Sequence, residues 1–250
     1  MKRTPIQEPD LDFDYGTFDS AGFTAATLAR WQSLAAVIDH TLLKPGATRK
    51  QVESLCAEAA RYRFACVLVN PVWASVAVKA LDGTGIPTGG VIGSPLGGSL
   101  VSSLRQEATA LFRLGARQLD MVLPIGQLKS GNYAAVRHTV QSVVNVAHQS
   151  GALLKVTLET SLLTMEEKLR ACEIAIQAGA DFIKTATSLA AGGATPADVA
   201  LLRGVAGARS GIKASGGIRS LAQLRALLEA GANRIGCSAS VAILRELGAE

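Results

Sequence analysis

Short apolar runs recur along the chain at roughly even spacing, and longer segments with a helical period separate them. In segment 166–178, for example, Leu169, Cys172 and Ile176 recur at intervals of three and four residues, which places them on one face of a helix. The apolar runs are the predicted strands, and they cover residues 37–39, 65–70, 89–93, 118–123, 153–159, 181–187, 211–216 and 234–238. The pattern predicts a regular alternation of strand and helix.

Capping residues mark the ends of the predicted helices. A glycine follows three helical segments and leads at once into a strand, as expected of a left-handed residue that ends a helix: Gly115, Gly179 and Gly231. Helix starts are marked by Thr48, by the capping box Thr164-Met165-Glu166-Glu167 and by Thr195-Pro196. These signals agree with the boundaries that the hydrophobic pattern predicts.

Eight strand–helix units in one chain predict an α/β fold, a closed (β/α)8 TIM barrel over residues 36–250. The alternative is a doubly wound open sheet, which usually carries a G-x-G-x-x-G motif after its first strand, and nothing of that kind follows residues 37–40. Residues 1–35 are expected to form an N-terminal extension, an acidic arm followed by a helix over 21–36. The apolar part of that helix, 23–34, would cover the barrel base or pack on a second subunit.

Composition narrows the class of protein. Hydrophobic residues make up 48% of the chain, enough for a large core, while aromatics supply only 4%, which argues against stacking platforms for single-stranded nucleic acid. The net charge is +5, and it divides into an acidic arm over the first twenty residues and a basic body. A basic body suits an anionic partner such as a phosphate, and solubility explains the same value equally well.

Cysteine usage and the N-terminus indicate the compartment. Four cysteines lie far apart without a C-x-x-C pair, so we interpret them as buried apolar residues in a reducing cytoplasm rather than as a disulfide or zinc framework: Cys56, Cys66, Cys172 and Cys237. The acidic start has no apolar run, and no stretch approaches the length of a membrane span. We expect a cytoplasmic protein with neither a membrane nor a nucleic-acid partner.

Polar residues inside four consecutive predicted strands are the strongest chemical signal. Asp120 lies in the fourth strand, Lys155 in the fifth, Lys184 in the sixth and Lys213 in the seventh. Because side chains alternate between faces, Lys155 shares its face with Thr157 and Glu159, and the apolar face should meet the helices. The polar faces should then converge inside the barrel.

A lysine with cationic neighbours in a dry site loses basicity and becomes nucleophilic, so it can form a Schiff base with a carbonyl compound. The alternative is a set of structural ion pairs between strand lysines and Asp120 or Glu159. Gly216 and Gly217 follow the seventh strand and Ser238 follows the eighth, where barrels commonly hold a phosphate. Together these features predict a phosphorylated carbonyl or sugar substrate.

Ordered motifs over about 38–243 resemble the deoxyribose-phosphate aldolase family. The motifs include Ile38-Asp39-His40-Thr41-Leu42-Leu43-Lys44-Pro45, Asp120-Met121-Val122, Lys184-Thr185, Gly192-Gly193-Ala194-Thr195 and Lys213-Ala214-Ser215-Gly216-Gly217-Ile218-Arg219. The resemblance implies a class I aldolase without metal or organic cofactor on a (β/α)8 barrel. Such an enzyme reversibly joins acetaldehyde to glyceraldehyde 3-phosphate and forms 2-deoxy-D-ribose 5-phosphate.

The resemblance also implies a role for each site residue. Lys184 would be the Schiff-base nucleophile, Lys213 the neighbour that lowers its pKa, and Asp120 the carboxylate that relays protons. The implied substrate-binding residues are Lys155, Asp39, Thr41, Thr187, Gly216, Gly217 and Ser238. Partners would be the small aldehyde and sugar-phosphate substrates, with a homodimer or higher homo-oligomer left open.

Two positions depart from the family pattern at the phosphate loops. Ser188 replaces a glycine after the sixth strand, and Ala239 replaces a second serine after the eighth. These changes leave open a related aldolase that prefers unphosphorylated aldehydes. A barrel that binds a phosphosugar without catalysis is a further alternative, although a binding protein has no need of a nucleophilic lysine.

Overall fold

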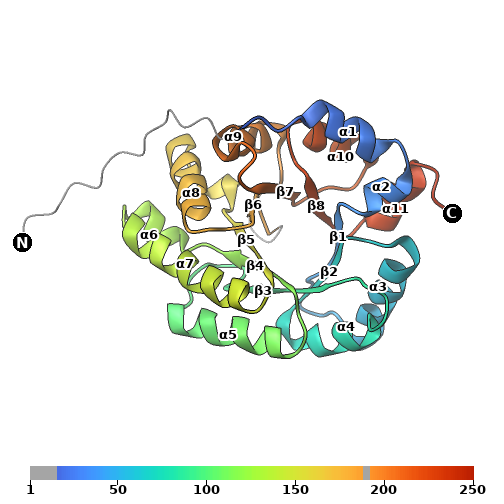
Figure 1. Ribbon diagram of the computed structural model, residues 1–250, viewed down its shortest axis with the longest axis horizontal. Helices are drawn as coiled ribbons and strands as arrows, with labels where there is room; N and C mark the ends of the chain where they lie inside the picture. Colours follow the sequence, from blue (N-terminus) through green and yellow to red (C-terminus); the bar gives the residue numbers. More distant parts are fainter. Residues whose placement is uncertain (1–15, 188–191) are drawn as a thin grey trace, which may run out of the picture.

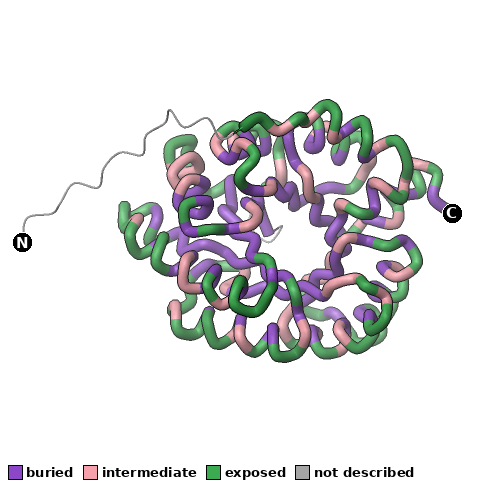
Figure 2. The backbone as a smooth tube through the Cα atoms, viewed as in Figure 1, coloured by how far each residue is buried: buried purple, intermediate pink, exposed green. Residues whose placement is uncertain are grey.

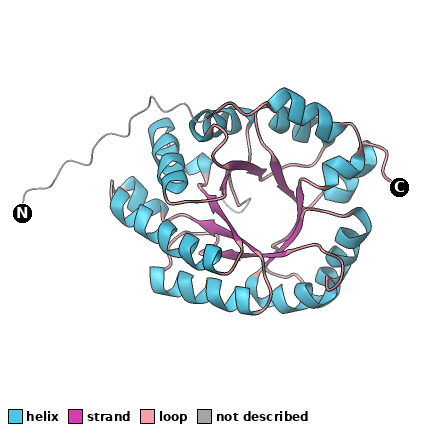
Figure 3. Cartoon of the chain, in the orientation of Figure 1, coloured by secondary structure: helices cyan, strands magenta, loops and turns pink. Residues whose placement is uncertain are grey.

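The strands form one closed parallel barrel in chain order, in a computed structural model that describes residues 16–187 and 192–250 (Figures 1 and 3). The eighth strand pairs with the first, so the sheet closes completely. The strands are β1 Ile38–Leu42, β2 Cys66–Val69, β3 Thr88–Ile92, β4 Gln118–Val122, β5 Leu153–Thr157, β6 Phe182–Lys184, β7 Gly211–Ser215 and β8 Arg234–Cys237. The predicted (β/α)8 barrel is confirmed.

Helices surround the barrel on all sides in the view of Figure 1. They are α1 Ser20–Leu28, α2 Trp31–Ala35, α3 Arg49–Tyr62, α4 Ala74–Ala80, α5 Val101–Arg113, α6 Ile125–Lys129, α7 Tyr133–Gln149, α8 Met165–Gln177, α9 Pro196–Ala206, α10 Leu221–Glu229 and α11 Ser240–Glu246, with short 3₁₀ turns η1 Pro71–Trp73 and η2 Thr160–Leu162. Among the helices of residues 16–187 and 192–250, none combines the length and the hydrophobicity of a membrane span.

The predicted caps are present. Thr48 and Thr164 each form a capping box at the start of α3 and α8, and Thr195 caps α9 with Pro196 in its first turn. Three glycines have φ values of 103°, 89° and 110° after their helices, as a left-handed helix end requires: Gly115, Gly179 and Gly231. Local chemistry therefore sets these boundaries.

The single helix predicted over 21–36 is wrong, because two helices occupy this region. The chain leaves α1 after Leu28, Arg30 is extended with φ −150° and ψ 145°, and α2 begins at Trp31. The helix α1 packs against α10 and α2 packs against α11, so the chain must bend between them. Figure 1 shows both helices on the outside of the ring rather than across the barrel base. The domain boundary at residue 35 stays a prediction, and the acidic arm up to residue 15 lies outside the described part.

Buried residues concentrate along the strands and the inner faces of the helices (Figure 2). The core consists mainly of Ala, Val, Leu and Ile, as the composition indicates. The four cysteines are buried and free, which confirms their interpretation as core residues. Burial raises the pKa of the Cys66 thiol to about 12, so this thiol stays neutral inside the barrel.

Candidate active site

Three lysines converge on the carboxylate of Asp120 inside the barrel. Its Oδ2 accepts hydrogen bonds from Lys184 Nζ at 2.8 Å and from Lys213 Nζ at 2.7 Å. Lys155 Nζ lies 3.2 Å from Asp120 Oδ1. The four strands β4 to β7 supply these residues, so the predicted convergence of polar faces is confirmed.

Asp39 on β1 provides a second buried carboxylate. Its Oδ2 lies 2.5 Å from Lys213 Nζ and 3.5 Å from Lys155 Nζ, while its Oδ1 accepts a hydrogen bond from Arg234 Nε at 2.7 Å. Arg234 is the first residue of β8, and the sequence reasoning missed it. The only signal it gives in the sequence is a charged residue at the start of an apolar run.

The lysines differ in their proton affinity. Burial lowers the pKa of Lys184 from its ordinary value, and Lys213 and Lys155 act in the same direction against the pull of Asp120. The pKa of Lys213 is raised, since its two carboxylate partners outweigh the effect of burial. Burial alone would raise the pKa of Asp120, but the three lysines hold it well below its usual range. Lys184 is therefore the lysine that gives up its proton more easily.

A cavity of about 280 Å³ opens over these lysines at the carboxyl ends of the strands. Lys184 and Lys213 lie at its floor, although Lys184 is only 3% exposed. Its other lining residues are Thr41, Leu42, Leu43, Lys44, Pro45, Leu68, Thr187, Ser215, Gly236, Cys237 and Ser238. The carboxyl ends of the strands are where barrel enzymes hold their substrates.

The sequence-predicted site residues divide into two groups. Thr41, Thr187 and Ser238 line the cavity together with Lys184 and Lys213. The side chains of Asp39, Asp120 and Lys155 are buried in the ion cluster and do not line the cavity. Gly216 and Gly217, in the loop after β7, do not line it either. The sequence reasoning missed the apolar lining that the β1 loop supplies through Leu42, Leu43 and Pro45. Ser188 lies outside the described residues.

Glu159 does not pair with the strand lysines, contrary to the alternative of ion pairs to this residue. It follows β5 in a left-handed conformation with φ 56° and ψ 62°, so the strand alternation that would align it with Lys155 has ended. Its Oε1 accepts a hydrogen bond from the Thr187 N–H at 2.7 Å. Glu159 thereby holds the segment that follows Lys184.

Glycines let the loops after β6 and β7 meet above the barrel. A Cβ on Gly193 would lie 2.4 Å from the carbonyl oxygen of Gly216, and that carbonyl accepts the Ala194 N–H at 3.1 Å. Gly236 on β8 makes room for the cluster, because a Cβ there would lie 2.8 Å from Lys213 Cε. Close approach of backbone at these positions needs glycine.

Several known proteins are similar to this chain in sequence and in fold. The family model described as DeoC/LacD family aldolase matches residues 33–246. The chain is 48% identical to a deoxyribose-phosphate aldolase of Lysinibacillus sphaericus over 88% of this chain and 98% of that protein, and 49% identical to one of Halalkalibacterium halodurans over 85% and 95%. A deoxyribose phosphate aldolase structure from Aeropyrum pernix, described as tetrameric, has a TM-score of 0.84 and 34% identity, and covers 91% of this chain and 96% of that one. The chain therefore belongs to the DeoC/LacD family of aldolases.

Proposed function

We propose that this aldolase reversibly joins acetaldehyde to glyceraldehyde 3-phosphate through a Schiff base on Lys184 and so forms 2-deoxy-D-ribose 5-phosphate. One observation carries the assignment of the nucleophile. Lys184 is the lysine at the cavity floor whose pKa is lowered, and it lies against Asp120 beside the charged Lys213. The names of the relatives supply the substrate class, deoxyribose phosphate.

In the proposed mechanism the neutral Nζ of Lys184 attacks the carbonyl carbon of acetaldehyde and forms a carbinolamine. Protonation of the hydroxyl group and loss of water give the iminium ion, and loss of a proton from the neighbouring carbon gives the enamine. The enamine carbon then forms the new bond to the aldehyde carbon of glyceraldehyde 3-phosphate, whose oxygen takes up a proton. Water finally hydrolyses the iminium ion, which releases the product and returns the free amine.

Asp120 and Lys213 would support the proton transfers of these steps. Asp120 Oδ2 already accepts from both lysines, while Oδ1 accepts no hydrogen bond within the described part of the chain. A carboxylate beside the imine nitrogen can take and return protons through a bound water. Lys213 stays protonated and therefore disfavours a second charge on Lys184.

The phosphate would lie at the loops after β7 and β8. Ser238 lines the cavity at this end, and Gly216 and Gly217 have φ values of 104° and 74°, a backbone conformation that favours glycine. Backbone N–H groups in such loops commonly hold a phosphate in barrel enzymes. Thr41, in β1, and Thr187, after β6, would contact the rest of the substrate.

Cleavage of 2-deoxyribose with and without its 5-phosphate tests this proposal. We expect kcat/KM to be at least about 100-fold higher for the phosphate ester, equivalent to roughly 2.7 kcal/mol of transition-state binding. Equal values would favour the unphosphorylated substrates that Ser188 and Ala239 left open. Lys184→Met should abolish turnover, whereas Lys129→Met removes only an exposed ion pair to Glu167 and should retain it. Retained turnover in Lys184→Met would contradict the assignment.

We further propose a cytoplasmic homo-oligomer that needs neither a metal nor an organic cofactor. The tetrameric state of the Aeropyrum pernix relative supports self-association. Among the described residues, no group of three or more His, Cys, Asp or Glu side chains is arranged to hold a metal ion. Sedimentation of the purified protein should give a mass that is a multiple of the 25.9 kDa chain, and the mass of a single chain would contradict the oligomer.

A further inference from the structure

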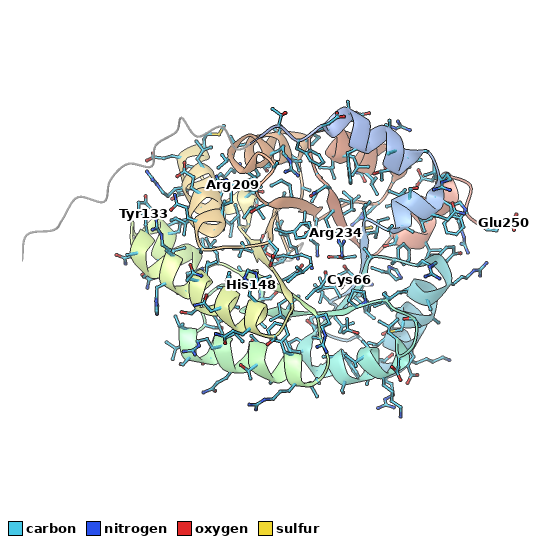
Figure 4. All side chains as sticks on the ribbon, viewed as in Figure 1. Cys66, Tyr133, His148, Arg209, Arg234 and Glu250 are labelled. Atoms are coloured by element: carbon cyan, nitrogen blue, oxygen red, sulfur yellow. The ribbon has the colours of Figure 1, made fainter. Side chains whose placement is uncertain are left out.

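Arg234 lies at the end of the barrel opposite the cavity. It opens β8, and Figure 4 shows it within the ring of strands, near Cys66. Its side chain is 15% exposed. Besides the 2.7 Å hydrogen bond to Asp39 Oδ1, its Nη2 donates to Gln118 Oε1 at 3.3 Å and to the Ala65 carbonyl at 3.4 Å. The guanidinium therefore links β8 to β1, to β4 and to the residue before β2 at the amino-terminal end of the barrel.

A chain of alternating charges runs from Arg234 to the cavity floor. Arg234 contacts Asp39, Asp39 contacts Lys213, Lys213 contacts Asp120, and Asp120 contacts Lys184. Each of these contacts is 2.8 Å or shorter, and all members from Asp39 onward are at most 3% exposed. Solvent screens such buried charges weakly, so a charge at one end is felt at the other.

The charges of this cluster do not balance. Arg234, Lys155 and Lys213 are three cations, while Asp39 and Asp120 are two anions, so the cluster carries an excess of one positive charge when Lys184 is neutral. Lys44 lines the cavity and the buried Glu159 follows β5, and these two side chains of opposite sign leave the net charge around Lys184 unchanged. The other titratable groups nearby are thiols: burial raises the pKa of Cys66 to about 12 and that of Cys237 to about 11. Both stay neutral, and Gln118 carries no charge. A proton on Lys184 would raise the excess to two.

We propose that Arg234 is a positioning residue for the aldol reaction: it fixes Asp39 against Lys213 from the far end of the barrel and supplies the excess positive charge that keeps Lys184 a free amine. The inference rests on the proposed Schiff-base role of Lys184. Arg234 acts through Asp39 and the buried cluster, without contact to the substrate. The hydrogen-bonded ion pair with the buried Asp39 explains why an arginine stands in a strand that is otherwise apolar.

The charge count predicts the pH dependence of three variants. The acidic limb of kcat/KM reports the loss of the free amine in the unliganded enzyme. Arg234→Gln lowers the excess positive charge to zero, so the pKa of Lys184 should rise and the limb should move up by roughly one pH unit. Asp39→Asn raises the excess to two, so the limb should move down by a similar amount. The double variant Asp39→Asn with Arg234→Gln restores the excess of one, and its limb should return to within about 0.3 unit of the wild type.

Conservative and matched variants separate charge from packing. Arg234→Lys keeps the cation, so its limb should stay in place even if its Tm falls. Arg117→Gln removes an exposed arginine just before β4 that has no carboxylate partner among residues 16–187 and 192–250, and it should leave the profile unchanged. Should Arg234→Gln fail to fold, the downward shift in Asp39→Asn and its reversal in the double variant test the same count, because the double variant leaves no unpaired carboxylate.

Borohydride trapping of acetaldehyde in each variant distinguishes failure of the inference from failure of the proposed function. A label on Lys184 together with an unmoved limb in Arg234→Gln and in Asp39→Asn overturns the role of Arg234 alone. A label on another residue overturns the assignment of Lys184, and the inference with it. The expected result is a label on Lys184 in all variants, with limb positions ordered by the charge count.

Discussion

The two lysines at the cavity floor, Lys184 and Lys213, differ in the number of carboxylates that they meet. Lys184 contacts Asp120, whereas Lys213 contacts both Asp120 and Asp39. One carboxylate does not offset burial and the neighbouring cations, while two do, so the pKa of Lys184 is lowered and that of Lys213 is raised. The additional contact of Lys213 with Asp39 thus makes Lys213 the cation and leaves Lys184, its neighbour on β6, as the lysine that becomes a free amine.

Replacement of Lys213 by leucine should raise the pKa of Lys184, because it removes the cation that lowers this pKa most. We expect the acidic limb of kcat/KM to move up by about 1–2 pH units, within the range typical of a close charge. Measurement of kcat/KM at pH values between about 5 and 9 gives the position of the acidic limb and so the pKa of Lys184. Lys129→Leu, which removes an exposed lysine, is the control, and a limb that does not move in Lys213→Leu would contradict the role of Lys213.

The sequence predicted the convergence of the three lysines on Asp120 because strand alternation fixes the face on which each side chain lies. It could not predict which carboxylate each lysine meets. The contacts of Asp39 with Lys213 and Arg234 cross from β1 to β7 and β8, and they form only when the barrel closes. Asp120 and Glu159 were the two predicted carboxylate partners of the strand lysines, but the left-handed backbone of Glu159 takes it off the strand face.

At the scale of elements, two loops support each other above the barrel. The backbone around Gly193, after β6, packs on Gly216, after β7, so the segment that follows Lys184 is coupled to the loop assigned to the phosphate. Glu159 fixes the same segment from β5 through the Thr187 N–H. The shape of this end of the site thus depends on backbone contacts between loops as well as on strand side chains.

Substitution of Gly193 by alanine should push these two loops apart. A new Cβ there would lie 2.4 Å from a backbone oxygen that cannot rotate away. Overpacking of this kind costs roughly 1–3 kcal/mol, so we expect KM for 2-deoxyribose 5-phosphate to rise about tenfold. Gly204→Ala in α9 is the matched control, since its Cβ would meet no atom of the described residues within 4 Å, and it should leave KM unchanged. Equal KM values in the two variants would show that the loops are not coupled.

Element boundaries followed from the sequence where local chemistry sets them. The capping boxes at Thr48 and Thr164 begin α3 and α8 as predicted. The break between α1 and α2 carries no local signal, because helical periodicity continues across Ala29 and Arg30. It arises from the attachment of each helix to a different partner, α10 or α11, which only the assembled barrel defines.

At the scale of the whole molecule, the barrel buries charge in its centre while the shell of helices provides an aliphatic core. The core encloses the ion cluster and keeps water away from four of its charged side chains, which are at most 1% exposed: Asp39, Asp120, Lys155 and Lys213. Low dielectric strengthens every interaction among these charges, and each charge needs its partner for the same reason. The feature that makes Lys184 reactive therefore also makes the fold sensitive to protonation of Asp39 and Asp120.

The free energy of unfolding should fall as the pH drops below about 4, the usual range for a carboxylate in an unfolded chain. Asp39 and Asp120 have folded-state pKa values below the ordinary 3.8, so the stability that they contribute is present above that value and is lost as the pH falls toward the folded values. Urea unfolding at several pH values measures the slope. Asp39→Asn should flatten it, whereas Asp82→Asn, at an exposed position, should not. A slope that is the same in both variants would contradict this linkage.

Covalent trapping tests the central claim, that Lys184 is the nucleophile, most directly. The protein is incubated with acetaldehyde and sodium borohydride, digested and mapped by mass spectrometry. Reduction of the Schiff base should add about 28 Da, one ethyl group, to the peptide that contains Lys184, and the addition should be absent in Lys184→Met. Lys155 and Lys213, which are fully buried and bound to carboxylates, should remain unmodified. An unmodified Lys184, or an ethyl group on Lys213 in its place, would contradict the account.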